Sequence, residues 1–181
     1  IDIDSAPDVE LPAAGPLRPD ALISPDGRTN REEDWSFATL SDIQFTAADP
    51  TLAKVGVAAL KRIRRHKPDL VVLNGDITDL GAPADLDLAR ETLEAGGCDL
   101  IPAGQELPED HTPSGGTVPC YYVPGNHEAY SVSGQGTLDA WKAEFGEAYR
   151  TFDHKGTWFI LLNSALGSLR DGCAISEVRS P

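Results

Sequence analysis

The sequence predicts an α/β fold in which parallel core strands alternate with helices and are followed by a hairpin. Three observations indicate it. Short apolar runs alternate along the chain with stretches of helical periodicity, each apolar run ends in a polar turn, and the last two strand-like segments flank a short turn that contains glycine. Strands that are connected through helices lie parallel in one sheet, so a parallel core is expected.

The individual elements follow from local patterns. The predicted strands span 35–40, 69–74 and 118–123, and the predicted helices span 51–66, 83–95 and 137–148. The run from Leu70 to Leu73 is wholly apolar, which is typical of a strand buried on both faces. Asp49 or Thr51 is expected to cap the first helix. Residues 149–152 and 157–163 flank a four-residue loop, and residues 97–117 are expected to form a surface loop.

Composition excludes several classes of protein. The 181 residues carry a net charge of −14, which argues against a nucleic-acid partner, since phosphate binding relies on clustered Lys and Arg. No apolar run approaches the roughly 20 residues that a membrane-spanning helix needs. The three cysteines are too scattered for a zinc site. A disulfide between Cys98 and Cys120 stays open, but we favour three free thiols, with Cys173 as the third.

Polar clusters follow all three predicted strands. They are Ser41-Asp42-Ile43-Gln44, Asn74-Gly75-Asp76 and Gly125-Asn126-His127-Glu128. Because the carboxyl ends of parallel strands meet at one edge of a sheet, we expect Asp42, Asp76, Asn126 and His127 to converge there. Two carboxylates and a carboxamide gathered in one place need positive charge between them, and oxygen ligands suit Mn²⁺, Mg²⁺ or Fe.

In this order the clusters resemble the D-x-H, G-D and G-N-H-[DE] motifs of the calcineurin-like metallophosphoesterase superfamily. The resemblance runs from about Trp35 to Leu169, with Gln44 standing where the family has a histidine. It implies a partial metallophosphoesterase-type sandwich. We therefore divide the chain into an acidic, proline-rich leader or linker (1–34), the N-terminal half of the domain (35–170) and an irregular tail (171–181).

The resemblance also implies roles for the motif residues. Two divalent or trivalent metal ions (Mn, Fe, Zn or Mg) would activate a hydroxide that hydrolyses a phosphomonoester or phosphodiester. Asp42 would bind the first ion, Asp76 would bridge both and Asn126 would bind the second. Gln44 is a candidate ligand that binds weakly, through water, or not at all. His127 would stabilise the phosphoryl oxygens or protonate the leaving group, and Glu128 would orient His127 or a loop.

Other features favour simpler interpretations. Asp79 and Asn163 could border the site, but we favour their interpretation as loop residues, and we interpret His111 and His154 as solvated side chains. The later histidine and the G-H-x-H motif of the family are absent, and there is no methionine. We therefore expect a truncated chain with impaired activity. The alternative is a non-catalytic metal-binding or structural fragment, open to self-association through a sheet edge. The expected substrate is a small-molecule, lipid or nucleotide phosphate ester, and a secreted bacterial location is mildly preferred.

Overall fold

A computed structural model describes residues 35–105, 107, 116–129, 137–163 and 165. The predicted leader (1–34) and tail (171–181) lie outside the described residues, as does His111. The domain boundaries therefore stay predictions.

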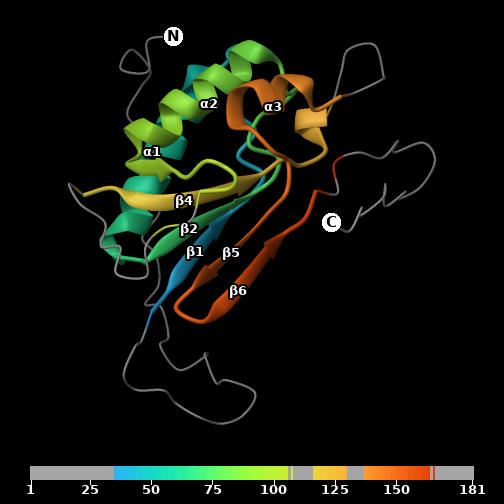
Figure 1. Cartoon of the computed structure of the whole chain (residues 1–181). Helices are drawn as coiled ribbons and strands as arrows, with labels where there is room; N and C mark the ends of the chain where they lie inside the picture. Colours follow the sequence, from blue (N-terminus) through green and yellow to red (C-terminus); the bar gives the residue numbers. More distant parts are fainter. Residues whose placement is uncertain (1–34, 106, 108–115, 130–136, 164, 166–181) are drawn as a thin grey trace.

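The described residues form a parallel four-stranded sheet with helices on one face and a hairpin on the other (Figure 1). In spatial order the sheet contains β1 (Phe37–Leu40), β2 (Leu70–Asn74), β4 (Val118–Val123) and β3 (Cys98–Leu100). The helices are α1 (Pro50–Arg65), α2 (Pro83–Ala95) and α3 (Asp139–Phe145), and the hairpin consists of β5 (Arg150–His154) and β6 (Thr157–Leu161). The predicted α/β class with a parallel core is confirmed.

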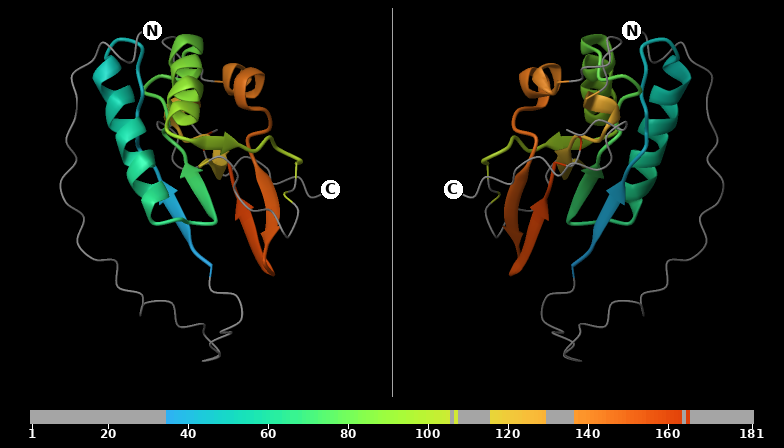
Figure 2. Two further views of the ribbon diagram at one scale, coloured as in Figure 1. Left: turned by 90° about the vertical axis from the view of Figure 1, so that its left-hand side faces the viewer. Right: turned by 90° about the vertical axis from the view of Figure 1, so that its right-hand side faces the viewer.

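Alternation of side chains along the strands produces two apolar layers. In β2, Val71 and Leu73 pack into the cluster shared with the helices, whereas Leu70 and Val72 pack into the cluster shared with the hairpin. Figure 2 shows the hairpin on the face opposite α1. Strand β2 is therefore covered on both faces, as its continuous apolar run predicts. Among the described helices, none is long and apolar enough to cross a membrane.

Three local predictions need correction. Strand β3 lies inside the predicted loop 97–117, because pairing with β4 rather than an apolar pattern makes it a strand. Helix α3 is shorter than predicted, since Gly146 leaves the helix with φ +82°. The hairpin loop has two residues instead of four: Lys155 and Gly156, with φ +50° and +76°, form a turn whose twist matches that of the strands.

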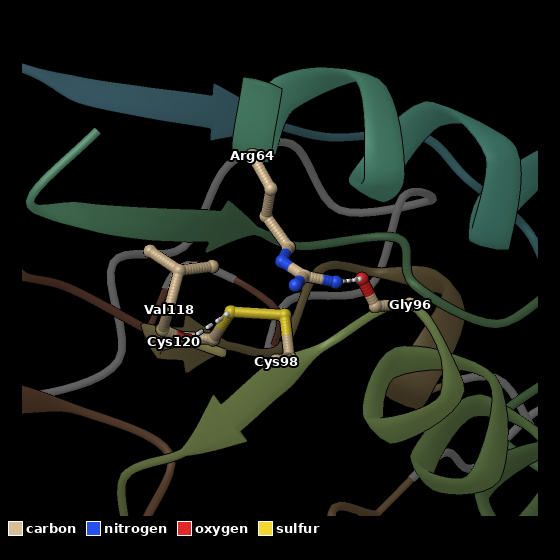
Figure 3. The surroundings of a disulfide bond; sticks show 5 residues. All are labelled: Arg64, Gly96, Cys98, Val118 and Cys120. Carbon is tan, nitrogen blue, oxygen red and sulfur yellow. Dashed lines mark hydrogen bonds between the residues drawn. A yellow bond between two sulfur atoms is a disulfide. The ribbon is translucent and has the colours of Figure 1, made fainter. Parts of the chain in front are cut away.

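The preference for three free thiols is also wrong, because Cys98 and Cys120 form a disulfide (Figure 3). In the parallel register Cys98 lies opposite Val118 and Leu100 lies opposite Cys120, and the Cα atoms of the two cysteines are 5.5 Å apart, within the range that a disulfide spans. In Figure 3 the side chain of Arg64 extends from α1 and donates to the Gly96 carbonyl at 3.1 Å. The disulfide between Cys98 and Cys120 fastens the edge strand β3 to β4.

A second group of contacts fastens the hairpin to the amino end of the sheet. Asp69 precedes β2 and accepts hydrogen bonds from Lys155 Nζ at 2.8 Å and from the Ser36 amide at 3.0 Å. Burial raises the pKa of Asp69, but these two donors outweigh it and lower the pKa overall. Trp35 meets the His154 ring edge-on, with 4.9 Å between the ring centroids. The expectation that His154 is solvated is therefore wrong, because Trp35 covers it.

The disulfide gives a first prediction. It closes a loop with a sequence separation of 22, so the Cys98→Ala/Cys120→Ala variant should lose about 3 kcal/mol of unfolding free energy, because its unfolded chain is less constrained. Urea unfolding of both proteins, with and without dithiothreitol, measures the loss. Dithiothreitol should lower the urea concentration at the unfolding midpoint of the natural chain and leave that of the variant unchanged. Equal midpoints for the two oxidised proteins would contradict the prediction.

The pH dependence of stability gives a second prediction. Burial lowers the pKa of His154 below its usual 6.5, although Asp69 and Asp153 act in the opposite direction and Lys155 acts in the same one. His154 then binds a proton more readily in the unfolded chain than in the folded one. The contribution of neutral His154 to the free energy of unfolding is therefore complete above about pH 6.5 and is lost as the pH falls through the lowered pKa of the folded chain. Urea midpoints measured from about pH 7 to about pH 5 should fall less steeply in His154→Gln than in the natural chain.

A matched control for this measurement lies at the end of α1. His66 is exposed, and His66→Gln serves as the control for replacing a histidine elsewhere on the domain. A His154→Gln profile that is superimposable on the natural one would show that His154 does not contribute.

Candidate metal centre

The turn after β1 is fastened to the turn after β2 by backbone hydrogen bonds. The Asp42 amide donates to the Gly75 carbonyl at 3.3 Å, and the Gln44 amide donates to the Asp76 carbonyl at 3.0 Å. Asp42, Gln44 and Asp76 have φ of +55°, +53° and +51°, in the left-handed region that L side chains rarely adopt. Strained backbone of this kind persists where surrounding structure holds it, and it is concentrated at functional sites.

The turn after β2 also contacts the turn after β4, and the contact is between Gly75 and Gly125. A Cβ on Gly75 would lie 2.8 Å from the Gly125 Cα, and a Cβ on Gly125 would overlap Asp76 Oδ1. Only glycine allows this approach of the two backbones. The carboxylate of Asp76 therefore lies directly beside the chain that carries Asn126 and His127.

Glu128 holds the turns after β2 and β4 together. Its side chain is 1 % exposed. Oε2 accepts hydrogen bonds from the amides of Asp76 (3.0 Å) and Gly125 (2.6 Å), while Oε1 accepts from the amide (2.7 Å) and hydroxyl (3.0 Å) of Thr78. One carboxylate thus satisfies four donors from two loops, and it orients the loops rather than the His127 ring.

His127 is held at three atoms. Its amide donates to Asp76 Oδ1 at 3.0 Å, and its Nδ1 lies 2.6 Å from the carbonyl oxygen of Asp79. A carbonyl only accepts, so Nδ1 carries a hydrogen and donates it. The carboxylate of Asp79 is 3.8 Å from the same nitrogen. On the other side of the ring, Nε2 lies 3.4 Å from Nε2 of Gln44.

The structure therefore brings Gln44, Asp76, His127 and Glu128 into direct contact. Asp42 and Asn126 lie in the same turns; Asp42 is exposed, and the Asn126 carbonyl accepts from Ala129 to open a short 3₁₀ helix at His127–Ala129. Asn163, which like Asp79 was interpreted as a loop residue, accepts a hydrogen bond from the Ala165 amide.

The preferred interpretation of Asp79 as a loop residue needs correction, since the alternative that it borders the site is the one that the structure supports, and sequence reasoning missed Thr78. Asp79 contacts His127, and Thr78 contacts Glu128. Their position directly after Asp76, on the same turn, is the signal that could have identified them.

The donor set of the predicted ligands suits hard cations. Among the described residues no three His, Cys, Asp or Glu side chains lie close enough together to hold a metal ion. The predicted set contains two carboxylates, Asp42 and Asp76, and two amides, Gln44 and Asn126, all of which would bind through oxygen. Oxygen donors favour Mg²⁺ or Mn²⁺ over zinc. The residues present thus fit a hard divalent ion.

Comparison with known proteins agrees with the motifs. The sequence matches the family model of calcineurin-like phosphoesterases over residues 36–173, which confirms the resemblance. No curated protein matches the sequence significantly.

The hydrogen bonds of Glu128 give a third prediction. In Glu128→Gln an amide NH₂ replaces one acceptor oxygen and faces buried donors, so the unfolding free energy should fall by about 3 kcal/mol. Urea unfolding measures the difference. The matched variant Glu91→Gln changes an exposed residue of α2 and should shift the free energy by less than about 0.5 kcal/mol. If the two variants are equally stable, the four hydrogen bonds do not hold the loops.

Proposed function

Because the chain belongs to the calcineurin-like phosphoesterase family, we propose that it hydrolyses a phosphomonoester or phosphodiester with bound metal ions. Metal-dependent hydrolysis of phosphoesters is the general activity of that family. The observation that carries the proposal is the junction of the turns after β2 and β4, where the His127 amide donates to the Asp76 carboxylate at 3.0 Å. A candidate metal ligand and a candidate proton carrier are thereby fixed side by side.

The proposed ligands are Asp42, Asp76 and Asn126, with Gln44 as the fourth candidate. When bound, two metal ions supply positive charge that polarises the phosphoryl group and lowers the pKa of a water molecule. Of Mn, Fe, Zn and Mg, the oxygen donors favour Mg²⁺ or Mn²⁺. The turns that carry Asp42 and Asp76 are joined by backbone hydrogen bonds, which hold the backbones of these two candidate ligands side by side.

His127 is the proposed catalytic residue. The Asp79 carbonyl holds the hydrogen on Nδ1, which leaves Nε2 as the ring atom for contact with the phosphate ester. Protonated at Nε2 as well, the ring would hydrogen-bond from that atom to a phosphoryl oxygen or give that proton to the departing alkoxide, and it would keep its hydrogen on Nδ1. The 2.6 Å contact to Asp79 keeps the ring from turning during this step.

A non-catalytic metal-binding or structural domain is the second candidate function. It is supported by the small number of anionic candidate ligands, because among the described residues no three His, Cys, Asp or Glu side chains are grouped so that they could hold a metal ion. Such a domain would act through association, and β1 and β3 are the edge strands available for it in the described sheet.

The proposed location is an oxidising compartment, such as the outside of a bacterial cell. The disulfide between Cys98 and Cys120 supports it, since disulfides persist in secreted proteins and are rare in the cytosol. Thiol labelling of the chain in the medium and in cell extracts of the source organism would test this location.

An activity measurement gives the fourth prediction. The purified chain is incubated with Mn²⁺ and either an aryl phosphodiester or an aryl phosphomonoester. Asp76→Asn should lower kcat/KM by about 100-fold or more, because one negative charge at the metal site is lost. Asp87 is an exposed aspartate on α2, and Asp87→Asn should retain full activity.

Metal analysis of the same samples separates the two candidate functions. Two bound ions and turnover that depends on Asp76 support the phosphoesterase. Bound metal without turnover supports the metal-binding domain. Equal turnover in the natural chain and in Asp76→Asn would refute the proposal.

A further inference from the structure

A cavity of about 230 Å³ lies between the turn after β1 and one face of α1. Its lining is mostly apolar: Leu40, Ile43 and Phe45 come from β1 and the turn that follows it, and α1 contributes side chains at helical spacing from Leu52 to Leu60. None of the ten described residues that line the cavity is basic. The two polar ones, Ser41 and Asp42, are exposed, so the lining reaches the surface of the molecule at the turn.

The inner wall of this cavity is fixed by Phe45. Its side chain is fully buried, its amide donates to the Ile77 carbonyl at 2.8 Å, and its carbonyl accepts from the Asp79 amide at 3.0 Å. The ring lies directly against α1 at Gly56, where a Cβ would overlap it. The wall therefore has a fixed shape before any ligand binds.

The width of the cavity depends on a small residue of α1. Ala59 lines it with a single methyl group, about one helical turn beyond Gly56. A larger side chain at this position would take up part of the volume. Ala58, the preceding residue, is half-buried and is not among the lining residues, so it offers a matched position for comparison.

Asp42 joins the cavity to the candidate metal centre. It lines the cavity, and it is also one of the proposed metal ligands. Its amide donates to the Gly75 carbonyl at 3.3 Å, which ties this part of the lining to the turn that carries Asp76. A phosphate ester that is bound through Asp42 would therefore have an apolar space beside it.

We propose that this cavity binds the alcohol group of the phosphate ester, and that the substrates are esters in which this group is a single aromatic ring or a compact aliphatic chain. This inference rests on the proposed phosphoesterase function. An apolar cavity of about 150 Å³ accepts benzene, so the volume here is sufficient for such a group. A polyol would leave its hydroxyl groups without hydrogen-bond partners against this lining, which opposes its binding.

Binding of the apolar group can be measured without metal or turnover. Benzyl alcohol is titrated into the metal-free full chain, and the methyl resonances of Val55, a lining residue, are followed by NMR after assignment with Val55→Ile. These resonances should move and saturate, because the ring packs against the side chain. Glycerol at the same concentrations should leave them in place.

A matched pair of variants locates the binding. Ala59→Leu should weaken the binding of benzyl alcohol by about tenfold or more, because the added carbons take up part of the cavity, whereas Ala58→Leu should bind it like the natural chain. Urea unfolding confirms that both variants fold. The comparison of benzyl alcohol with glycerol needs no variant, so it decides the question even if Ala59→Leu does not fold.

Turnover tests whether the substrate uses the cavity. Benzyl phosphate, glycerol phosphate and the methyl diesters of both are offered to the chain with Mn²⁺, and all of them release or retain primary alcohols of similar leaving ability. The value of kcat/KM should be higher for the benzyl esters by about tenfold or more. Ala59→Leu should remove most of this preference, and Ala58→Leu should keep it.

The outcomes separate this inference from the proposed function. Turnover without a preference for the benzyl esters, a preference that survives in Ala59→Leu, or unmoved Val55 resonances in an active chain would overturn the inference and leave the phosphoesterase intact. Absence of turnover with every ester would refute the phosphoesterase, and with it any use of the cavity by a substrate. Moved Val55 resonances together with a preference that Ala59→Leu removes support both.

Discussion

The carboxylate of Glu128 is almost entirely removed from water, and a buried charge of this kind is tolerated only where other groups replace its hydration. Three backbone amides and one hydroxyl do so, from Asp76, Thr78 and Gly125. Because most of these donors belong to the backbone, the carboxylate fixes the path of two loops at once. The turns that carry the functional side chains are thereby held in place.

Backbone conformation contributes the second constraint. Asp42, Gln44 and Asp76 all have φ near +50°, where each costs roughly 1–2 kcal/mol. Hydrogen bonds between the turns and close packing of Gly75 on Gly125 offset this cost. The sheet thus supports a rim of strained turns after β1 and β2. Such a rim is organised before any ligand arrives, which reduces the rearrangement that binding would require.

Much of this architecture could be predicted from local patterns. The apolar run of β2 and the periodicity of α1 depend on the residues of those elements themselves, and polar turns after parallel strands meet at one edge for topological reasons. Other features depend on partners distant in the sequence. Cys98–Leu100 becomes a strand only through β4, and its disulfide depends on that register. Asp79 acts through a backbone carbonyl, which every residue type possesses, so its side chain gave no sign of the role.

The hydrogen bonds between the Glu128 carboxylate and the amides of the two turns also limit how the length of this chain can vary. Adding or deleting a residue between Asp76 and Thr78, or between Gly125 and Glu128, would move a donor by more than 3 Å along the chain and out of reach of its acceptor. These two intervals should therefore keep a constant number of residues during divergence, even where individual side chains are exchanged. New termini for a permuted chain, or the ends of an inserted reporter domain, belong elsewhere on the molecule.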